Sequence, residues 1–170
     1  FAIMIKKNKI LDERAINQKI TRLAWQIYED NLNEDRIVII GVSGRGEVLA
    51  SRLSKIISQI SSIKTRLGKI NLDKDSPYNS EITVNLDAKE YKDKVIILVD
   101  DVLNSGKTLM YASKYFLTNA IVKLSTVVLV DRNHNRFPIK ADYVGLSMAT
   151  TLQQYITVVL NGKDQAVYLC

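Results

Sequence analysis

The chain has 170 residues, of which 46% are hydrophobic and 25% are charged; this is typical of one globular domain spanning residues 1–170 and excludes collagenous, coiled-coil and disordered classes. A net charge of +6 favours an anionic partner, either a phosphorylated small molecule or RNA. No segment approaches the roughly eighteen uncharged apolar residues of a membrane span. The single cysteine, Cys170, excludes a disulfide framework and a Cys/His metal cluster, and it fits a cytoplasmic location.

The first five residues, Phe1–Ile5, precede lysines instead of following them, which is the reverse of a signal peptide. We expect them to form a docked strand, or to include an extension foreign to the protein before Met4. Secretion is therefore not indicated.

Hydrophobic periodicity predicts alternating helices and strands in the first half of the chain. Helices are expected at Asp12–Asn31, with Asp12 as the N-cap, and at Glu47–Ile60. Strands are expected at Arg36–Ile40, Lys69–Leu72 and Glu81–Leu86, with a polar loop between the last two.

The second half continues the alternation. Lys94–Val99 and Ser125–Val130 are apolar runs typical of strands buried on both faces, and a helix is expected between them at Gly106–Asn119. Two further strands, Tyr155–Leu160 and Gln165–Leu169, flank the turn dipeptide Asn161-Gly162. The pattern predicts an α/β fold with a Rossmann-like parallel sheet flanked by helices and a small antiparallel hairpin, or hood. In such sheets ligands bind beyond the carboxyl ends of the strands.

Two adjacent acids and a small polar loop follow the strand that ends at Val99. Asp100 and Asp101 are followed by Val102 and Leu103, and the loop residues are Asn104, Ser105, Gly106, Lys107 and Thr108. A helix start of this composition offers backbone N–H groups and hydroxyls to a phosphate, and two carboxylates could hold a polyol or a metal. Alternatively, the acids simply end a strand and precede a helix.

Two common nucleotide motifs are absent. A Walker A loop needs a glycine five positions before Gly106, where this chain has Asp101. The glycines of Gly41-Val42-Ser43-Gly44-Arg45-Gly46 are spaced G-x-x-G-x-G, which is not the dinucleotide fingerprint.

The segment from Val99 to Thr108 resembles the phosphoribosyl diphosphate signature of type I phosphoribosyltransferases. Further segments resemble the branch of pyrimidine-operon attenuators that double as uracil phosphoribosyltransferases, and they occur in the same order as in that branch. These segments are Ile20–Ala24, Gly41–Gly46, Asp131–His134 and Pro138–Gly145.

The resemblance implies a Mg²⁺-dependent pentosyltransferase whose metal arrives with phosphoribosyl diphosphate, near Asp100 and Asp101. These two acids, with Arg45, are the implied catalytic residues, the acids binding the ribose hydroxyls. The loop of Asn104, Ser105, Gly106, Lys107 and Thr108 would wrap the 5′-phosphate. The turn formed by Ser43, Gly44, Arg45 and Gly46 would hold the pyrophosphate, which a guanidinium and a helix N-terminus can neutralise as it departs.

The resemblance also implies a nucleobase acceptor, with uracil favoured. Tyr143 would stack on the base and Val144 would read its edge, with Asp131 and Arg132 near the same pocket; on sequence alone Tyr143 could equally be core and Asp131 a strand-end cap. Asn104 replaces the aspartate that serves many purine-salvage relatives as a general base. A purine-base enzyme of the hypoxanthine/guanine class is the alternative, supported by Lys107, Tyr143 and Leu146.

RNA is the second candidate partner. Arg14, Gln18 and Arg22 recur on one helical stripe, and Arg132, Arg136 and Lys140 add later charge that could grip phosphates. His134 could contact RNA, whereas Trp25 stands where the branch typically has His. These charges could equally form a solvated face. A nucleotide-sensing regulator without catalysis is a further alternative, and the resemblance implies a homodimer or a higher homo-oligomer.

Overall fold

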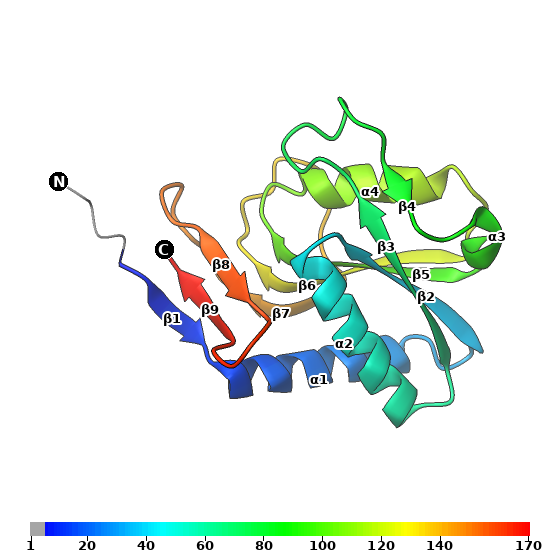
Figure 1. Ribbon diagram of the computed structural model, residues 1–170, viewed down its shortest axis with the longest axis horizontal. Coiled ribbons are helices and arrows are strands. Elements are labelled where there is room, and N and C mark those ends of the chain that lie inside the picture. The colour runs from blue at the N-terminus through cyan, green and yellow to red at the C-terminus, as the bar shows by residue number, and fades with distance from the viewer. Residues whose placement is uncertain (1–5) are drawn as a thin grey trace.

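The computed structural model describes residues 6–170 (Figure 1). Phe1–Ile5, where a docked strand or an extension is expected, lie outside the described residues. In chain order the elements are β1 (Asn8–Leu11), α1 (Glu13–Glu29), β2 (Arg36–Val42), α2 (Arg45–Ile60), β3 (Lys64–Asn71), β4 (Thr83–Val84), α3 (Ala88–Tyr91), β5 (Val95–Leu103), α4 (Lys107–Leu117), β6 (Lys123–Asp131), β7 (Tyr143–Ser147), β8 (Ile156–Val159) and β9 (Ala166–Leu169). Within residues 6–170, no helix has both the length and the apolarity needed to cross a membrane.

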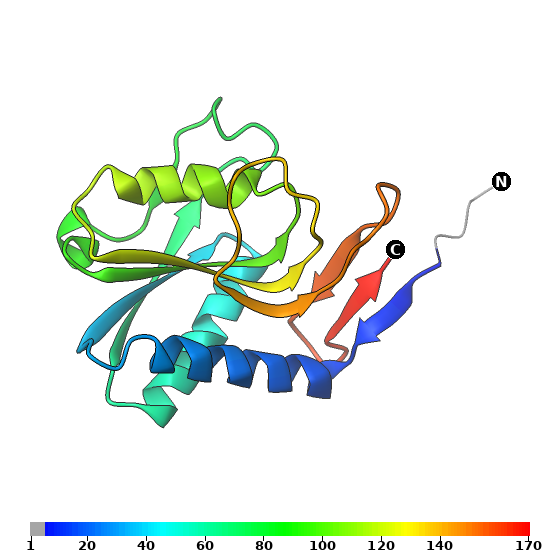
Figure 2. The same cartoon turned by 180° about the vertical axis from the view of Figure 1, so that it is seen from behind.

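The main sheet has six strands in the order β4-β3-β2-β5-β6-β7. Neighbouring strands are parallel from β3 to β7, and only the short edge strand β4 runs antiparallel. Helices α1 and α2 cover one face, while α3 and α4 cover the other (Figures 1 and 2). Because both faces are covered, Val95 to Val99 of β5 are fully buried, as their unbroken apolar run predicts. The α/β fold expected from the sequence is confirmed.

The small sheet contains three strands in the order β1-β9-β8, all antiparallel. The hairpin expected around Asn161-Gly162 is confirmed, and Gly162 has a φ of +81°. Strand β1 was not predicted, because a four-residue strand with two exposed positions has too little pattern to detect. The small sheet lies beyond the amino end of α1, and residues 148–155, here the connecting segment, join β7 to β8 (Figure 1).

Several predicted boundaries are wrong in ways that matter for the site. Strand β5 continues to Leu103, so Asp100 and Asp101 lie inside a strand instead of after it. Helix α2 begins at Arg45, two residues before the predicted start, because Gly44 already serves as its N-cap. Strand β3 begins at Lys64 because pairing with β2 orders a charged stretch that has no apolar alternation of its own.

Candidate active site

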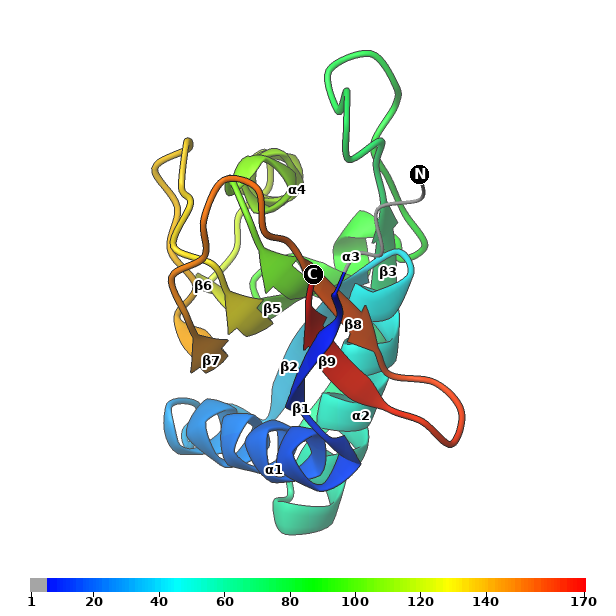
Figure 3. The ribbon, with the colours of Figure 1, turned by 90° about the vertical axis from the view of Figure 1, so that its left-hand side faces the viewer.

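Two buried carboxylates lie at the carboxyl end of β5, near the sheet edge onto which Figure 3 looks. The side chains of Asp100 and Asp101 are only 4% and 5% exposed. Arg45 Nε donates to Asp101 Oδ2 at 2.6 Å. Asp100 Oδ1 accepts from the Asp101 backbone N–H at 2.9 Å and from Lys74 Nζ at 3.3 Å. The two acids therefore have separate cationic partners.

Their protonation states differ for a physical reason. Burial, together with the neighbouring Asp101 charge, raises the pKa of Asp100 to about 7, although Lys74 opposes the shift. Burial also opposes ionisation of Asp101, but hydrogen bonds from Asp100 and Arg45 outweigh it and hold the pKa of Asp101 below its ordinary value. The pair thus tends to keep one proton, on Asp100, below neutral pH.

The loop after β5 opens helix α4 and has the geometry of an anion site. Gly106 is the N-cap with a φ of +86°, and a Cβ at this position would lie 2.7 Å from Ile139 Cγ2. The Ser105 carbonyl accepts from the backbone N–H groups of Arg136 and Phe137 at 2.8 and 3.0 Å. These contacts hold the first turn of α4 in place, with its N–H groups at the positive end of the helix dipole.

The turn before α2 meets the acid pair from the other side. A Cβ on Gly46 would lie 2.8 Å from the Val99 carbonyl oxygen and 3.1 Å from Asp100 Cα, so only glycine lets α2 approach β5 this closely. The Ser43 N–H donates to the Ile70 carbonyl at 2.9 Å, which ties the turn to β3. This packing places Arg45 beside the acid pair.

A cavity of about 400 Å³ unites these groups. Its lining includes the predicted residues Arg45, Asp100, Asp101, Asn104, Ser105, Lys107 and Thr108. It also includes Lys74, Asp75 and Ile156, which the sequence did not single out as site residues. Ser43, Gly44, Gly46 and Gly106 shape the surrounding backbone without lining this cavity.

The loop between β3 and β4 reaches over the cavity. Besides the contact between Lys74 and Asp100, Lys107 Nζ donates to the Asp75 carbonyl at 2.7 Å. Lys107 therefore ties two loops together in this structure. No sequence signal separated Lys74 from the other charges of this polar loop, because only its distant partner distinguishes it.

The predicted base-binding residues separate into two groups. Asp131 and Arg132 lie at the carboxyl end of β6, but the Arg132 guanidinium donates to Thr150 Oγ1 at 3.0 Å, to Asn104 Oδ1 at 2.8 Å and to the Gln154 carbonyl. In this conformation the guanidinium therefore holds the surrounding chain instead of facing a base.

Tyr143 and Val144, the other two predicted base-binding residues, do not line the cavity. Tyr143 begins β7 level with Val99 in the strand register, but its side chain is buried in the core on the side of α1 and α2, and its hydroxyl donates to Asp30 Oδ2 at 2.8 Å. The Val144 side chain packs in the core, and its carbonyl accepts from Arg22 at 2.8 Å.

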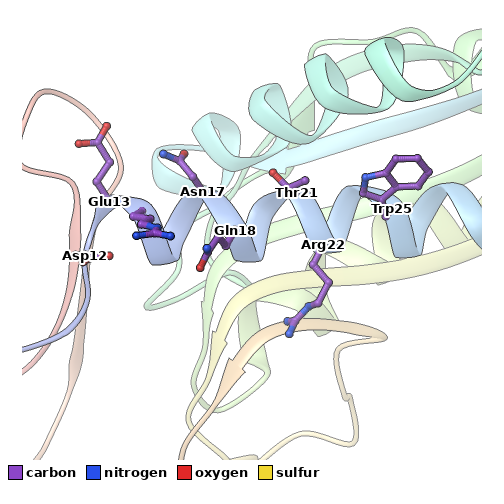
Figure 4. Close-up of a pocket in the computed structure, with 8 residues that line it drawn as sticks. Asp12, Glu13, Asn17, Gln18, Thr21, Arg22 and Trp25 are labelled. Atoms are coloured by element: carbon purple, nitrogen blue, oxygen red, sulfur yellow. The ribbon is translucent and has the colours of Figure 1, made fainter.

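A second, larger hollow of about 870 Å³ runs along the outer face of α1 (Figure 4). Asn17, Thr21 and Trp25 form one edge, and Gln18 and Arg22 form the other. Arg22 points to β7 and donates to the carbonyls of Val144 and Gly145, each at 2.8 Å, so in this conformation its guanidinium is engaged within the protein. It secures the edge strand of the main sheet.

Comparisons with known proteins identify the family and the fold. The sequence family described as the phosphoribosyl transferase domain matches residues 7–159. Two proteins named bifunctional protein PyrR are similar to the chain: that of Clostridium acetobutylicum is 38% identical over 94% of this chain and 93% of its own length, and one from Staphylococcus aureus is 35% identical over 92% and 93%.

Two solved structures share the fold. The hypoxanthine phosphoribosyltransferase of Trypanosoma cruzi has a TM-score of 0.72 at 21% identity and covers 88% of this chain and 84% of its own. The hypoxanthine-guanine phosphoribosyltransferase of Bacillus anthracis has a TM-score of 0.71 at 25% identity, with 86% and 84% covered. The length of the family match and the identity to the PyrR proteins together lead to one conclusion: the chain belongs to the phosphoribosyl transferase domain family.

Proposed function

We propose that the protein transfers the 5-phosphoribosyl group of phosphoribosyl diphosphate to a nitrogen of a nucleobase, with uracil as the favoured acceptor, and releases pyrophosphate. The observation that carries this proposal is the cavity shared by the acid pair, Arg45 and the amino end of α4. A phosphorylated sugar diphosphate needs a polyol site between two anion sites, and this cavity supplies groups of all three kinds.

In the proposed complex, each group acts on a different part of the substrate. The N–H groups and hydroxyls at the start of α4 bind the 5′-phosphate, and Asp100 and Asp101 accept hydrogen bonds from the ribose hydroxyls. Arg45, with its side chain 55% exposed, can turn part of its donor set to the pyrophosphate while keeping Asp101 ionised. Positive charge near the leaving group lowers the barrier as the anomeric carbon gains oxocarbenium character.

A magnesium ion fits this donor set as a metal that comes with the substrate. Among residues 6–170, no group of three or more His, Cys, Asp or Glu side chains is arranged to hold a metal by itself. Two adjacent carboxylates plus substrate oxygens match the preference of Mg²⁺ for a few protein carboxylates, phosphates and water. When bound, the ion would supply neutralisation of the pyrophosphate charge.

Uracil is favoured over a purine base because two of the features that supported a purine acceptor, Lys107 and Tyr143, have other partners in the structure. Lys107 bonds to Asp75, and Tyr143 lies in the core, so neither side chain meets a base in this conformation. Asn104 has no basic group to take a proton from a purine, and its amide oxygen already accepts from Arg132.

The test measures pyrophosphate release from phosphoribosyl diphosphate with Mg²⁺, in the presence of uracil, hypoxanthine, guanine, xanthine or no base. We expect release that depends on uracil and is abolished by Asp101→Ala, since this variant removes a ribose ligand and the partner of Arg45. Full activity of Asp101→Ala would refute the placement of the site. Binding of phosphoribosyl diphosphate without release for any base would instead favour the nucleotide-sensing alternative.

Sequence-specific RNA binding is the second proposed function, carried by the hollow along α1. Its exposed Arg14, Gln18 and Thr21 can contact a sugar-phosphate backbone, and the Trp25 side chain, 43% exposed, can stack on an unpaired base. The curated relatives are named as bifunctional, which supports a function besides phosphoribosyl transfer.

This second function is tested by nuclease protection of pyrimidine-operon leader RNA at physiological salt. We expect Trp25→Ala and Arg14→Ala to weaken protection, while Arg36→Ala, an equivalent loss of charge at the amino end of β2, leaves it unchanged. Arg22→Ala is unsuitable because it would also release β7. A leader RNA that binds no better than bulk RNA would refute the proposal.

A further inference from the structure

Arg132 joins three segments that are far apart in the sequence. It follows β6 directly, and its backbone N–H donates to the Leu103 carbonyl at 3.1 Å, which keeps it beside the end of β5. Its guanidinium bonds Asn104 in the loop before α4, and Thr150 and Gln154 in the connecting segment. A planar guanidinium can serve three acceptors in fixed directions, which the single ammonium of lysine cannot do.

The connecting segment is otherwise held by the turn that contains Arg132 and, at its end, by two backbone hydrogen bonds between Tyr155 and Cys170. His134 Nε2 pairs with the Thr150 carbonyl, and the Met148 N–H donates to the Asp131 carbonyl at 2.9 Å. Within the segment, the Thr151 N–H donates to Gln154 Oε1 at 2.9 Å. The segment therefore depends on polar contacts and not on a buried apolar face, as the 87% exposure of Leu152 shows.

The guanidinium of Arg132 has only neutral acceptors: an amide, a hydroxyl and a carbonyl. Partial burial lowers the pKa of Arg132, so its N–H groups are partly removed from water and depend on these partners. The segment then leads into Ile156, whose side chain lines the cavity next to the acid pair. Ile156 itself is paired with Leu169 in the small sheet, so Arg132 acts on the part of the chain that leads up to this cavity wall.

We infer that Arg132 is a positioning residue that couples the phosphate loop, residues 104–108, to the connecting segment and thereby shapes the cavity next to Ile156, where we place the acceptor base. This inference rests on the proposed function. A phosphate bound at the loop fixes Asn104, Asn104 fixes the Arg132 guanidinium, and the guanidinium fixes Thr150 and Gln154. Arg132 itself touches neither the sugar nor the base.

Hydrogen exchange of the full chain tests the coupling, with ribose 5-phosphate as the probe. In the wild type we expect slower exchange both at residues 104–108 and at the Thr151 and Gln154 amides. In Arg132→Met we expect slowing at residues 104–108 alone. Arg36→Met, which makes the same substitution at an exposed position, should behave like the wild type.

Kinetics supply a second readout. We expect Arg132→Met to raise KM for the nucleobase about tenfold or more, the loss expected for charge-assisted hydrogen bonds, with KM for phosphoribosyl diphosphate changed much less. Arg132→Lys should show the same rise in KM, because lysine keeps the charge but lacks the planar set of donors. A normal KM in Arg132→Lys would mean that only the charge is needed. Thr150→Val should give a smaller defect that is not additive with Arg132→Met.

Specific outcomes would overturn the inference. Equal slowing at Thr151 and Gln154 in the wild type and in Arg132→Met would do so, as would rescue by Arg132→Lys. Protection of residues 104–108 in the wild type without any change in the connecting segment would overturn the coupling but leave the proposed function intact. No protection at residues 104–108 in the wild type would overturn the proposed function and this inference with it.

Discussion

Replacing Asp100 with Asn should stabilise the protein in a pH-dependent way while removing activity. The Asp100 carboxyl is buried beside another carboxylate, and its pKa rises from 3.8 to about 7 in the folded protein. Between these values the folded chain binds a proton that the unfolded chain has lost, so the free energy of unfolding falls as pH rises. Above about pH 7 both states are ionised and this contribution stays constant.

The magnitude follows from the width of that interval. From pH 5 to about pH 7, an interval of roughly two pH units, only the folded chain holds the proton. The free energy of unfolding of the wild type therefore falls by about 2–3 kcal/mol between pH 5 and pH 8. The amide that Asp100→Asn introduces cannot titrate but can still accept from the Asp101 N–H, so the variant avoids this loss. For a chain of this size, the gain in Tm of Asp100→Asn over wild type should be roughly 5–10 °C larger at pH 8 than at pH 5.

The assay is thermal unfolding of both proteins at the two pH values. The difference in Tm between variant and wild type is compared at the two pH values, so any pH-independent cost of burying the amide cancels. Asp164→Asn, an exposed carboxylate in the turn between β8 and β9, is the control, and its effect on Tm should be the same at both pH values. An equal effect of Asp100→Asn at pH 5 and pH 8 would mean that Lys74 already keeps Asp100 ionised, and the reasoning about the pair would fail.

Three further predictions concern single side chains. Arg45→Gln should raise KM for phosphoribosyl diphosphate about tenfold or more and lower Tm, because it removes the guanidinium beside the buried Asp101; an unchanged KM would contradict its role. Gly106→Ala should cost roughly 1–3 kcal/mol of stability and lower turnover, since its positive φ and the contact with Ile139 leave no room for a Cβ; a wild-type Tm would argue against this geometry. Tyr143→Phe should lose about 1 kcal/mol with the bond to Asp30 and keep KM for the base, whereas a large rise in KM would restore the stacking role.

The sequence by itself determined the helices, strands and turns that depend only on residues close together in the chain. The periodicity of α1 and its Asp12 cap, the buried runs of β5 and β6, and the Asn161-Gly162 turn are all local signals, and each corresponds to an observed element. The start of α4 after β5 was also readable, because a helix that follows a buried strand places its first N–H groups at the sheet edge whatever surrounds it.

Only the tertiary structure decided which charges act together. Lys74 meets Asp100, Lys107 meets Asp75 and Arg22 meets β7 across large separations in sequence, so no local pattern could distinguish these side chains from solvated ones. Tyr143 is a related case: its place in the family order suggested a base platform, but packing in the core directs its side chain to Asp30. Sequence periodicity specifies which elements form, whereas long-range packing specifies which ends of them meet.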